Sequence, residues 1–269
     1  MRLLFLLSCT LLTLAACQQN PLATIASTTT DTLSYRYDTM TQRNRVCRGE
    51  EDSCAIITFR YPVFTGHGAS ALNARVQRKL CEAYTDTVLH ATTAEVMQQF
   101  LSSYDTMLAQ WKDYATPWFY EKTITVQRQA GGYICLQTSV YEFAGGAHPN
   151  SYIQYQHIDM KSNRELKISD WLKDADDKPL YRLAETLFRK DLHLSSDAQL
   201  DTAGFFFDKG QFGLPVNYYF DDTALVFFYN DYEIRCHAEG PYDLVIPYKV
   251  LKPLMKMDSR MPPQTPKGA

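Results

Sequence analysis

The sequence predicts an α+β fold in which helices and strands are partly segregated along the chain. Helix-periodic stretches lie at about residues 72–88, 92–111 and 178–193. Segments rich in β-branched and aromatic residues, which are typical of strands, fill most of the chain after Pro117. We therefore expect a small N-terminal strand–helix subdomain packed with a C-terminal antiparallel sheet that one or two helices cover.

The N-terminus has the pattern of an exported lipoprotein. Arg2 precedes the apolar run Leu3–Ala16, which is shorter than the roughly 20 residues that a membrane-spanning helix needs. The run ends in Leu-Ala-Ala-Cys17 and resembles the bacterial lipobox. We therefore expect cleavage of the signal peptide before Cys17 and attachment of acyl chains, such as palmitate, to this cysteine. Two or more acyl chains anchor a protein stably. The alternative is an ordinary secretory signal, with Cys17 incidental.

The residues after Cys17 indicate in which membrane of the cell envelope the protein is anchored. Gln18 stands where an aspartate would favour retention at the inner membrane, so we expect the outer membrane, with the protein facing the periplasm or the cell surface. Residues 17–31 are polar and Thr-rich and are predicted to form a flexible tether. The rest of the chain has no second long apolar stretch, so the lipid is the expected contact with the membrane.

Composition and motifs exclude several function classes. The 45% hydrophobic and 13% aromatic content exclude a mainly disordered chain, and the net charge of −3 gives no reason to expect nucleic acid binding. The sequence contains no G-x-S-x-G, H-E-x-x-H or phosphate-binding glycine loop. We therefore assign no catalytic residue, no metal ligand and no cofactor.

Five of the seven cysteines remain after Cys9 leaves with the signal peptide and Cys17 is lipidated. Cys47 and Cys54 bracket a polar turn and are the best candidates for a disulfide in an oxidising compartment. Their six intervening residues do not fit a CxxC metal site. Among Cys81, Cys135 and Cys236, one pair and one free thiol are possible, and the sequence does not choose the pair.

The N-terminal elements follow from local patterns. Residues 32–40 and 55–64 are strand-like, and apolar residues from Leu72 onward recur at helical spacing with Ser70 as the expected N-cap. A second helix opens with the capping-box pattern Thr92-Thr93-Ala94-Glu95, and its apolar face is expected to extend to Trp111.

The C-terminal elements are mostly strands. A hairpin is expected around Ala130-Gly131-Gly132, and an amphipathic helix over about 178–193. A short helix is expected near 249–256. The expected strands are residues 119–128, 133–143, 151–160, 165–168, 216–220, 224–234 and 242–247.

One motif carries a resemblance to a known family. Tyr141-Glu142-Phe143-Ala144-Gly145-Gly146-Ala147-His148 looks like the Y-x-x-x-GGAH signature of the RsiV-like family. That family includes the domain of the lysozyme-sensing anti-sigma factor RsiV and a domain of PdaC-type peptidoglycan deacetylases. Further similar segments are Ile158-Asp159, residues 165–170, residues 225–234, Gly240 and residues 245–248, and upstream residues 57–62 and Leu72-Asn73.

The resemblance implies the domain plan. We expect a signal peptide (1–16), a lipidated cysteine and tether (17–31), a subdomain resembling the PdaC accessory domain (32–116), an RsiV-like domain (117–258) and a disordered tail (259–269). The transmembrane helix of the anti-sigma factor and the catalytic domain of the deacetylase are missing from this sequence. The resemblance therefore implies an accessory or binding domain of the envelope, whose ligand is a lysozyme-type muramidase or peptidoglycan.

His148 is the strongest candidate for a catalytic or metal-binding residue. The two preceding glycines permit a tight turn, so His148 either bonds that loop or acts as an acid, a base or a metal ligand. The segment Asn230-Asp231-Tyr232-Glu233 is a predicted turn whose acidic and aromatic character would suit a basic partner such as lysozyme.

Three functions follow from these observations. The leading hypothesis is a non-catalytic, lipid-anchored envelope protein that binds a protein or cell-wall ligand. The second is a hydrolase or deacetylase-like enzyme that acts on cell-wall glycan through His148. The third is a lipoprotein that scaffolds other envelope proteins.

Overall fold

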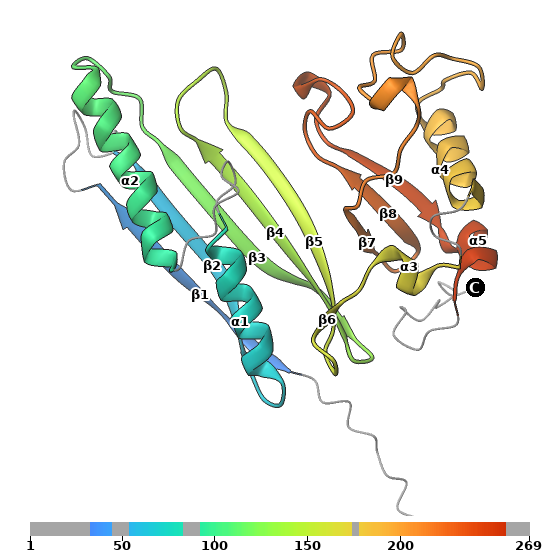
Figure 1. The fold of residues 1–269 in the computed structure, drawn as a ribbon, viewed down its shortest axis with the longest axis horizontal. Coiled ribbons are helices and arrows are strands. Elements are labelled where there is room, and N and C mark those ends of the chain that lie inside the picture. Colours follow the sequence, from blue (N-terminus) through green and yellow to red (C-terminus); the bar gives the residue numbers. More distant parts are fainter. Residues whose placement is uncertain (1–32, 45–53, 83–91, 174–177, 257–269) are drawn as a thin grey trace, which may run out of the picture.

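The computed structural model describes residues 33–44, 54–82, 92–173 and 178–256. The predicted signal peptide, Cys17, the tether, Cys47 and the C-terminal tail lie outside these ranges. The described part is an α+β structure with one six-stranded and one three-stranded sheet, as the sequence predicts (Figure 1).

The six-stranded sheet follows the order of the sequence, β1-β2-β3-β4-β5-β6. All neighbours are antiparallel except β2 and β3, which are parallel. Parallel neighbours need a long crossover, and α1 and α2 lie in this connection. The strands are β1 (Ser34–Arg43), β2 (Ile56–Thr65), β3 (Phe119–Ala130), β4 (Tyr133–Phe143), β5 (Asn150–Asp159) and β6 (Arg164–Glu165).

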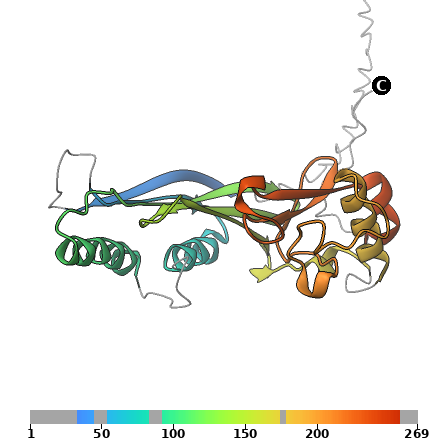
Figure 2. The same cartoon turned by 90° about the horizontal axis from the view of Figure 1, so that it is seen from above.

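Two helices cover one face of this sheet, α1 (Ala69–Leu80) and α2 (Thr93–Gln110). Figure 2 shows both on the same side of the strands. Thr92 caps α2 as predicted, since its side chain accepts a hydrogen bond from the backbone N–H of Glu95. The core beneath the helices contains Leu72, Val76, Tyr104, Phe59 and Ile134, among others.

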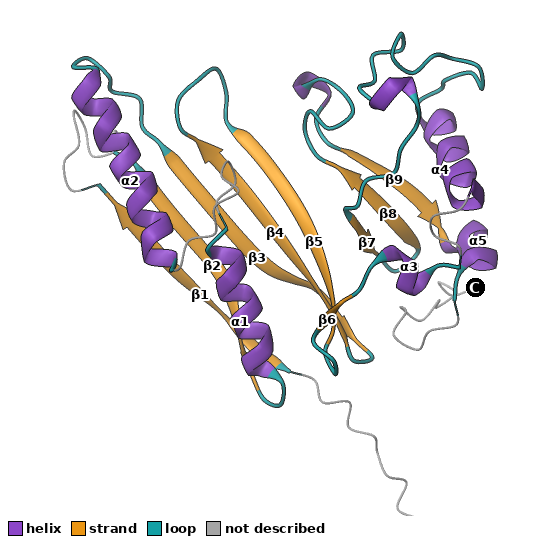
Figure 3. Cartoon of the chain, viewed as in Figure 1, coloured by secondary structure: helices purple, strands orange, loops and turns teal. Residues whose placement is uncertain are grey.

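The second sheet is an antiparallel meander of β7 (Tyr218–Phe220), β8 (Ala224–Tyr229) and β9 (Tyr242–Pro247). Helix α4 (Lys178–Asp191) packs against β9. The shorter helices of this part are α3 (Ile168–Trp171), α5 (Tyr248–Leu251), η2 (Asp208–Gly210), η3 (His237–Glu239) and η4 (Lys252–Leu254) (Figure 3).

Strand β4 contributes to two hydrophobic cores. Ile134 and Leu136 face the core under α1 and α2, whereas Tyr133 and Cys135 belong to the core built by α4 and the second sheet. Successive side chains of a strand point to opposite faces, so one strand supports both cores. The six-stranded sheet also runs across residue 117, where the sequence placed a domain boundary, because β2 pairs directly with β3.

Several local expectations are wrong. The first helix, expected over about residues 72–88, spans Ala69–Leu80, and the strand expected over 165–168 is only Arg164–Glu165, since Ile168 begins α3. The N-cap of α1 is Gly68, with φ 79°, and not Ser70. Trp111 does not continue the apolar face of α2, because the helix ends at Gln110; the Trp111 side chain is 63% exposed. Strand β8 ends at Tyr229 and not at residue 234, because Tyr232 adopts a positive φ of 63°, which a strand cannot accommodate.

Candidate functional site

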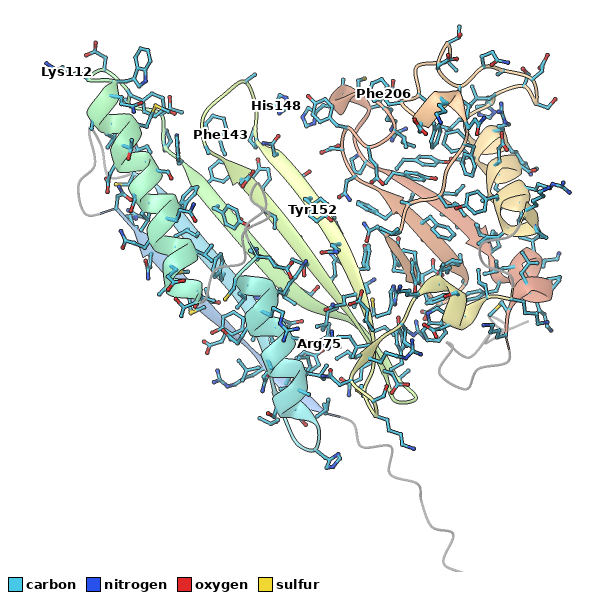
Figure 4. All side chains as sticks on the ribbon, in the orientation of Figure 1. Arg75, Lys112, Phe143, His148, Tyr152 and Phe206 are labelled. Carbon is cyan, nitrogen blue, oxygen red and sulfur yellow. The ribbon has the colours of Figure 1, made fainter. Side chains whose placement is uncertain are left out.

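The candidate site lies where the β4–β5 loop meets the loop that follows β8. Both glycines of the first loop have positive φ, 88° at Gly145 and 111° at Gly146. A Cβ atom at Gly145 would also lie 2.8 Å from the hydroxyl of Tyr114. Backbone conformation and close packing therefore both require glycine here, and the turn carries His148 toward the second sheet (Figure 4).

His148, Tyr232 and His237 form what we call the histidine cluster. The ring of His148 stacks on that of His237, with 4.1 Å between centroids and 9° between planes. Tyr232 lies beside His237, with centroids 5.4 Å apart. Half of the Tyr232 surface is exposed, so the cluster presents an aromatic surface to solvent.

Both ring nitrogens of His148 are engaged. Nδ1 lies 2.9 Å from the carbonyl oxygen of Pro149, which can only accept, so Nδ1 carries the hydrogen. In the neutral ring Nε2 is then an acceptor, and the hydroxyl of Tyr232, 3.1 Å away, donates to it. These contacts hold the imidazole between its own loop and the loop of the second sheet.

Carboxylates lie beside the cluster. One carboxylate oxygen of Asp231 accepts a hydrogen bond from the hydroxyl of Ser151 at 2.8 Å and lies 3.7 Å from Nδ1 of His237. Glu233 accepts a hydrogen bond from the backbone N–H of Asn230 at 2.8 Å, and burial raises the pKa of the Glu233 carboxyl. The Glu239 side chain is 56% exposed and lies in the same connection between β8 and β9.

Two asparagines join the two sheets along the edge of β5. The side-chain oxygen of Asn230 accepts from the backbone N–H of Ile153 at 2.7 Å, and its nitrogen donates to the Ile153 carbonyl at 3.1 Å. Asn217 accepts from the N–H of Tyr155 at 2.9 Å and donates to Ile153 at 2.8 Å. These amides occupy hydrogen-bonding positions on β5 that a neighbouring strand would otherwise fill.

The structure thus brings His148 together with Asn230, Asp231 and Tyr232, although the sequence separates them by more than 80 residues. Tyr141 has a different role, because its ring packs on Phe119 with centroids 5.0 Å apart. Ala147 is an exposed residue of the turn.

The sequence missed His237, Ser151 and Asn217. Cys236 precedes the short helix η3, and His237 is the first residue of that helix. The Cys236 thiol is 3.7 Å from a carboxylate oxygen of Glu239, while His237 stacks on His148. No local pattern marks His237, Ser151 and Asn217, since their contacts with His148, Asp231 and Ile153 join distant parts of the chain.

His157 and the acidic pairs Asp221-Asp222 and Asp176-Asp177 are further residues of types that can act in catalysis. Those that the structure describes make structural contacts. His157 is 2% exposed and is bonded to the hydroxyl of Tyr133 and the carbonyl of Tyr218, each at 2.7 Å. Asp221 accepts from the N–H groups of its own turn, and Asp222 pairs with Arg128 at 3.2 Å. The other acidic pair, Asp176-Asp177, lies outside the described residues.

The cysteines differ from expectation in one respect. Cys81, Cys135 and Cys236 are all free, so no pair forms among them. Cys54 is buried and disulfide-bonded, and its expected partner Cys47 lies outside the described residues.

The described ranges contain neither a metal-binding group nor a helix that could span a membrane. No three His, Cys, Asp or Glu side chains there are grouped so that they could hold a metal ion. None of the helices described has the length and apolar character needed to cross a membrane.

Comparisons with known proteins agree with this architecture. Residues 48–151 match the family described as Deacetylase PdaC, and residues 166–249 match the family described as Protein of unknown function (DUF3298). The first match supports the expected likeness to PdaC, but it extends past residue 116 to residue 151 and so includes the GGAH turn. No curated protein matches the chain.

Two solved structures have a similar fold. A DUF3298 family protein from Pseudomonas aeruginosa PAO1 superimposes with a TM-score of 0.67 at 22% identity, covering 86% of this chain and 98% of that one. A DUF3298 family member from Bacteroides fragilis NCTC 9343 gives 0.67 at 18% identity, covering 84% and 96%. At these identities the likeness shows the fold alone.

Proposed function

We propose that this chain is a lipid-anchored protein of the cell envelope that binds a partner through the histidine cluster and its neighbouring carboxylates, without catalysing a reaction. One observation carries the proposal. The GGAH turn and the acidic-aromatic loop, which the sequence analysis named separately, are in contact through His148 and the half-exposed Tyr232.

The contacts of His148 favour binding over catalysis. A general acid or base must exchange a proton with a substrate within hydrogen-bond reach. Here Nδ1 and Nε2 are bonded to Pro149 and Tyr232, and one face of the ring is covered by His237. His148 is therefore placed to orient the exposed tyrosine.

The proposed ligand is a basic muramidase of the lysozyme type, with peptidoglycan as the second candidate. Glu233 and Glu239 are exposed and give this surface acidic character, although Arg235 lies 4.0 Å from Glu239; the side chain of Asp231 is 10% exposed. The whole chain carries a net charge of −3. Opposite charges steer association, and a half-exposed tyrosine is the kind of residue that dominates binding energy.

The test is titration of the protein with hen lysozyme in physiological salt. We expect saturable binding that Tyr232→Ala weakens at least about tenfold, as for an interface hot spot. Tyr181→Ala is the matched control, because Tyr181 is an exposed tyrosine on α4. If the protein bound purified sacculi but not lysozyme, peptidoglycan and not a muramidase would be the ligand. Binding to neither would refute the proposal.

The competing function is hydrolysis or deacetylation of cell-wall glycan, which the name of the PdaC family suggests. Incubation with labelled peptidoglycan distinguishes the two. We expect no released product from the native protein. Product that the native protein releases and His148→Ala does not would establish catalysis and overturn the binding role.

The lipid anchor rests on the lipobox at Cys17. Two acyl chains or more are needed for stable anchoring. We expect mass spectrometry of the intact mature protein to show a lipid-modified N-terminal cysteine, and Cys17→Ala to leave the protein unmodified and in the soluble fraction. If the native protein carried no lipid, the N-terminal segment would be an ordinary secretory signal and the anchor would be refuted.

A further inference from the structure

Strand β1 forms one edge of the six-stranded sheet and pairs with β2 alone (Figure 1). At its end, the backbone N–H of Asn44 donates to the carbonyl oxygen of Ala55 at 3.1 Å, so the even-numbered residues of β1 bond toward β2. The odd-numbered residues therefore turn their N–H and C=O groups away from the sheet. Between residues 34 and 42 these are Tyr35, Tyr37, Thr39 and Thr41.

The outer edge of β1 is open in the described part of the chain. No other element there bonds to the outward backbone groups of β1, and the Asp38 carboxylate of the same strand accepts from the N–H of Thr39 at 3.0 Å. Natural sheets block such edges with short strands, bulges, prolines or lysines. Strand β1 is ten residues long, pairs with β2 without a bulge, and contains neither proline nor lysine.

The far side of the same sheet is treated differently. The side chains of Asn217 and Asn230 occupy hydrogen-bonding positions along the edge of β5, and β6 pairs with the end of that strand. The protein thus closes one edge of its sheet with its own residues and leaves a long, regular strand at the other.

Two exposed charges of opposite sign lie on β1. Arg36 and Asp38 are two residues apart, so they project from the same face of the strand, with side chains 68% and 45% exposed. Within one copy their charged groups are 3.7 Å apart, and an exposed pair of this kind contributes little to stability. The order of the two charges is self-complementary. In an antiparallel pair of β1 strands centred on Tyr37, Arg36 lies opposite Asp38 of the second copy, and Asp38 opposite Arg36.

Charge selects this register over its neighbours. A two-fold axis at Arg36 or at Asp38 would place two like charges directly opposite each other, which is destabilising. An axis at Thr39 would place neither charge opposite another charge. With the axis at Tyr37, the four charges alternate in sign both along each strand and across the seam between the strands.

We propose that β1 is a dimerisation edge, through which two copies of this chain pair antiparallel about Tyr37 and join their six-stranded sheets into one. The outward groups of Tyr37 then bond to those of Tyr37 in the second copy, and those of Tyr35 bond to Thr39 of the second copy. The N–H of Thr39 exchanges the Asp38 carboxylate for a backbone carbonyl, which leaves Asp38 to pair with Arg36 across the seam. Strand β1 lies at the opposite edge of the sheet from the β5 region that carries Ser151, so the proposal does not depend on the proposed function.

The experiment measures the mass of the full chain in solution by sedimentation equilibrium, in a density-matched detergent. We expect a reversible equilibrium between monomer and dimer over concentrations of roughly 1 to 100 µM, the range of a moderate interface.

Charge reversals assign the dimer to β1. Arg36→Asp places two pairs of like charges across the seam and should weaken dimerisation at least about tenfold, and Asp38→Arg should do the same. Both side chains are exposed, so both variants should fold. The double variant Arg36→Asp/Asp38→Arg has opposite charges across the seam again and should dimerise as the native protein does. Lys161→Asp makes the same change in net charge as Arg36→Asp at an exposed position outside β1, and this matched control should leave the dimer unchanged.

Mixing the two single variants gives an independent readout. An Arg36→Asp chain beside an Asp38→Arg chain has opposite charges at both crossings of the seam. We therefore expect an equimolar mixture to form heterodimers at concentrations where neither variant dimerises alone. Native mass spectrometry distinguishes the heterodimer, because the two chains differ in mass.

Three results would overturn the proposal. The first is a monomer over the whole concentration range. The second is native dimerisation in both single variants, which would place the interface elsewhere, and the third is a folded double variant that stays monomeric. A native protein that binds lysozyme as a monomer at every concentration would refute the dimer and leave the histidine cluster as the partner site.

Discussion

At the scale of single residues, His157 shows how burial fixes a protonation state. Its Nε2 must donate to the carbonyl oxygen of Tyr218, so Nδ1 accepts from the hydroxyl of Tyr133. A proton on Nδ1 would turn the Tyr133 hydroxyl from donor to acceptor and place a charge in the core. Burial accordingly lowers the pKa of His157 to about 4.

We predict that this histidine makes stability depend on pH. In the unfolded chain its pKa is about 6.5, so between pH 6.5 and 4 unfolding takes up a proton and the native state loses stability as pH falls. The contribution is present in full above pH 6.5, and up to about 3 kcal/mol is lost by pH 4. Urea unfolding at pH 7, 6 and 5 measures this.

The control for that prediction is His157→Gln, which keeps one donor and one acceptor but does not titrate. Its free energy of unfolding should fall less between pH 7 and 5 than that of the native protein. His67→Gln, at an exposed position, should behave as the native protein does. An unchanged pH slope in His157→Gln would show that other groups cause the acid sensitivity.

At the scale of elements, the edge of β5 is completed by side chains. Asn230 and Asn217 bond to the backbone of Ile153 and Tyr155, as a strand would. Each asparagine flanks a strand of the second sheet, Asn217 just before β7 and Asn230 just after β8. The two sheets are therefore joined without a continuous ladder of backbone hydrogen bonds.

We predict that Asn230→Ala frees the amide of Ile153 and destabilises the protein by about 1–3 kcal/mol, the cost of an unmade buried hydrogen bond. Hydrogen exchange should accelerate at Ile153 in this variant and at Tyr155 in Asn217→Ala. Gln211→Ala, at an exposed position, should change neither amide. Unaltered exchange at Ile153 in Asn230→Ala would mean that the contact contributes little.

At the scale of the whole molecule, two hydrophobic cores share strand β4. Trp118 lies in the core under α1 and α2, whereas Trp171 lies in the core of α4 and the second sheet. Alternation along β4 ties these cores together, so we expect them to unfold as one cooperative unit.

A core truncation tests this coupling. Phe188 is fully buried against Phe205, Phe212 and Tyr242, so Phe188→Ala should cost about 3–5 kcal/mol. With the exposed Trp111 replaced by Phe, proteins that keep only Trp118 or only Trp171 should report the same shift in the urea midpoint. A shift seen by Trp171 alone would show that the cores unfold separately.

The sequence by itself determined the elements whose signals are local. The N-cap at Thr92, the Gly131-Gly132 turn of the β3–β4 hairpin and the apolar period of α4 depend on neighbouring residues, and the structure contains all three. The GGAH turn is local in the same sense, since its glycines supply the positive φ that the loop needs. The envelope location and the lipid at Cys17 remain predictions from the sequence.

Only the tertiary structure decided where β8 ends, how the two sheets join, and which residues surround His148. Each depends on contacts between residues far apart in the chain, such as Ser151 with Asp231 and His148 with His237. The buried position of Lys122 is of the same kind, because α1 must pack on the sheet before the carbonyl oxygens of Lys79 and Glu82 can accept from its ammonium. Periodicity along a sequence records which face of an element is buried, but it carries no information about what that face meets.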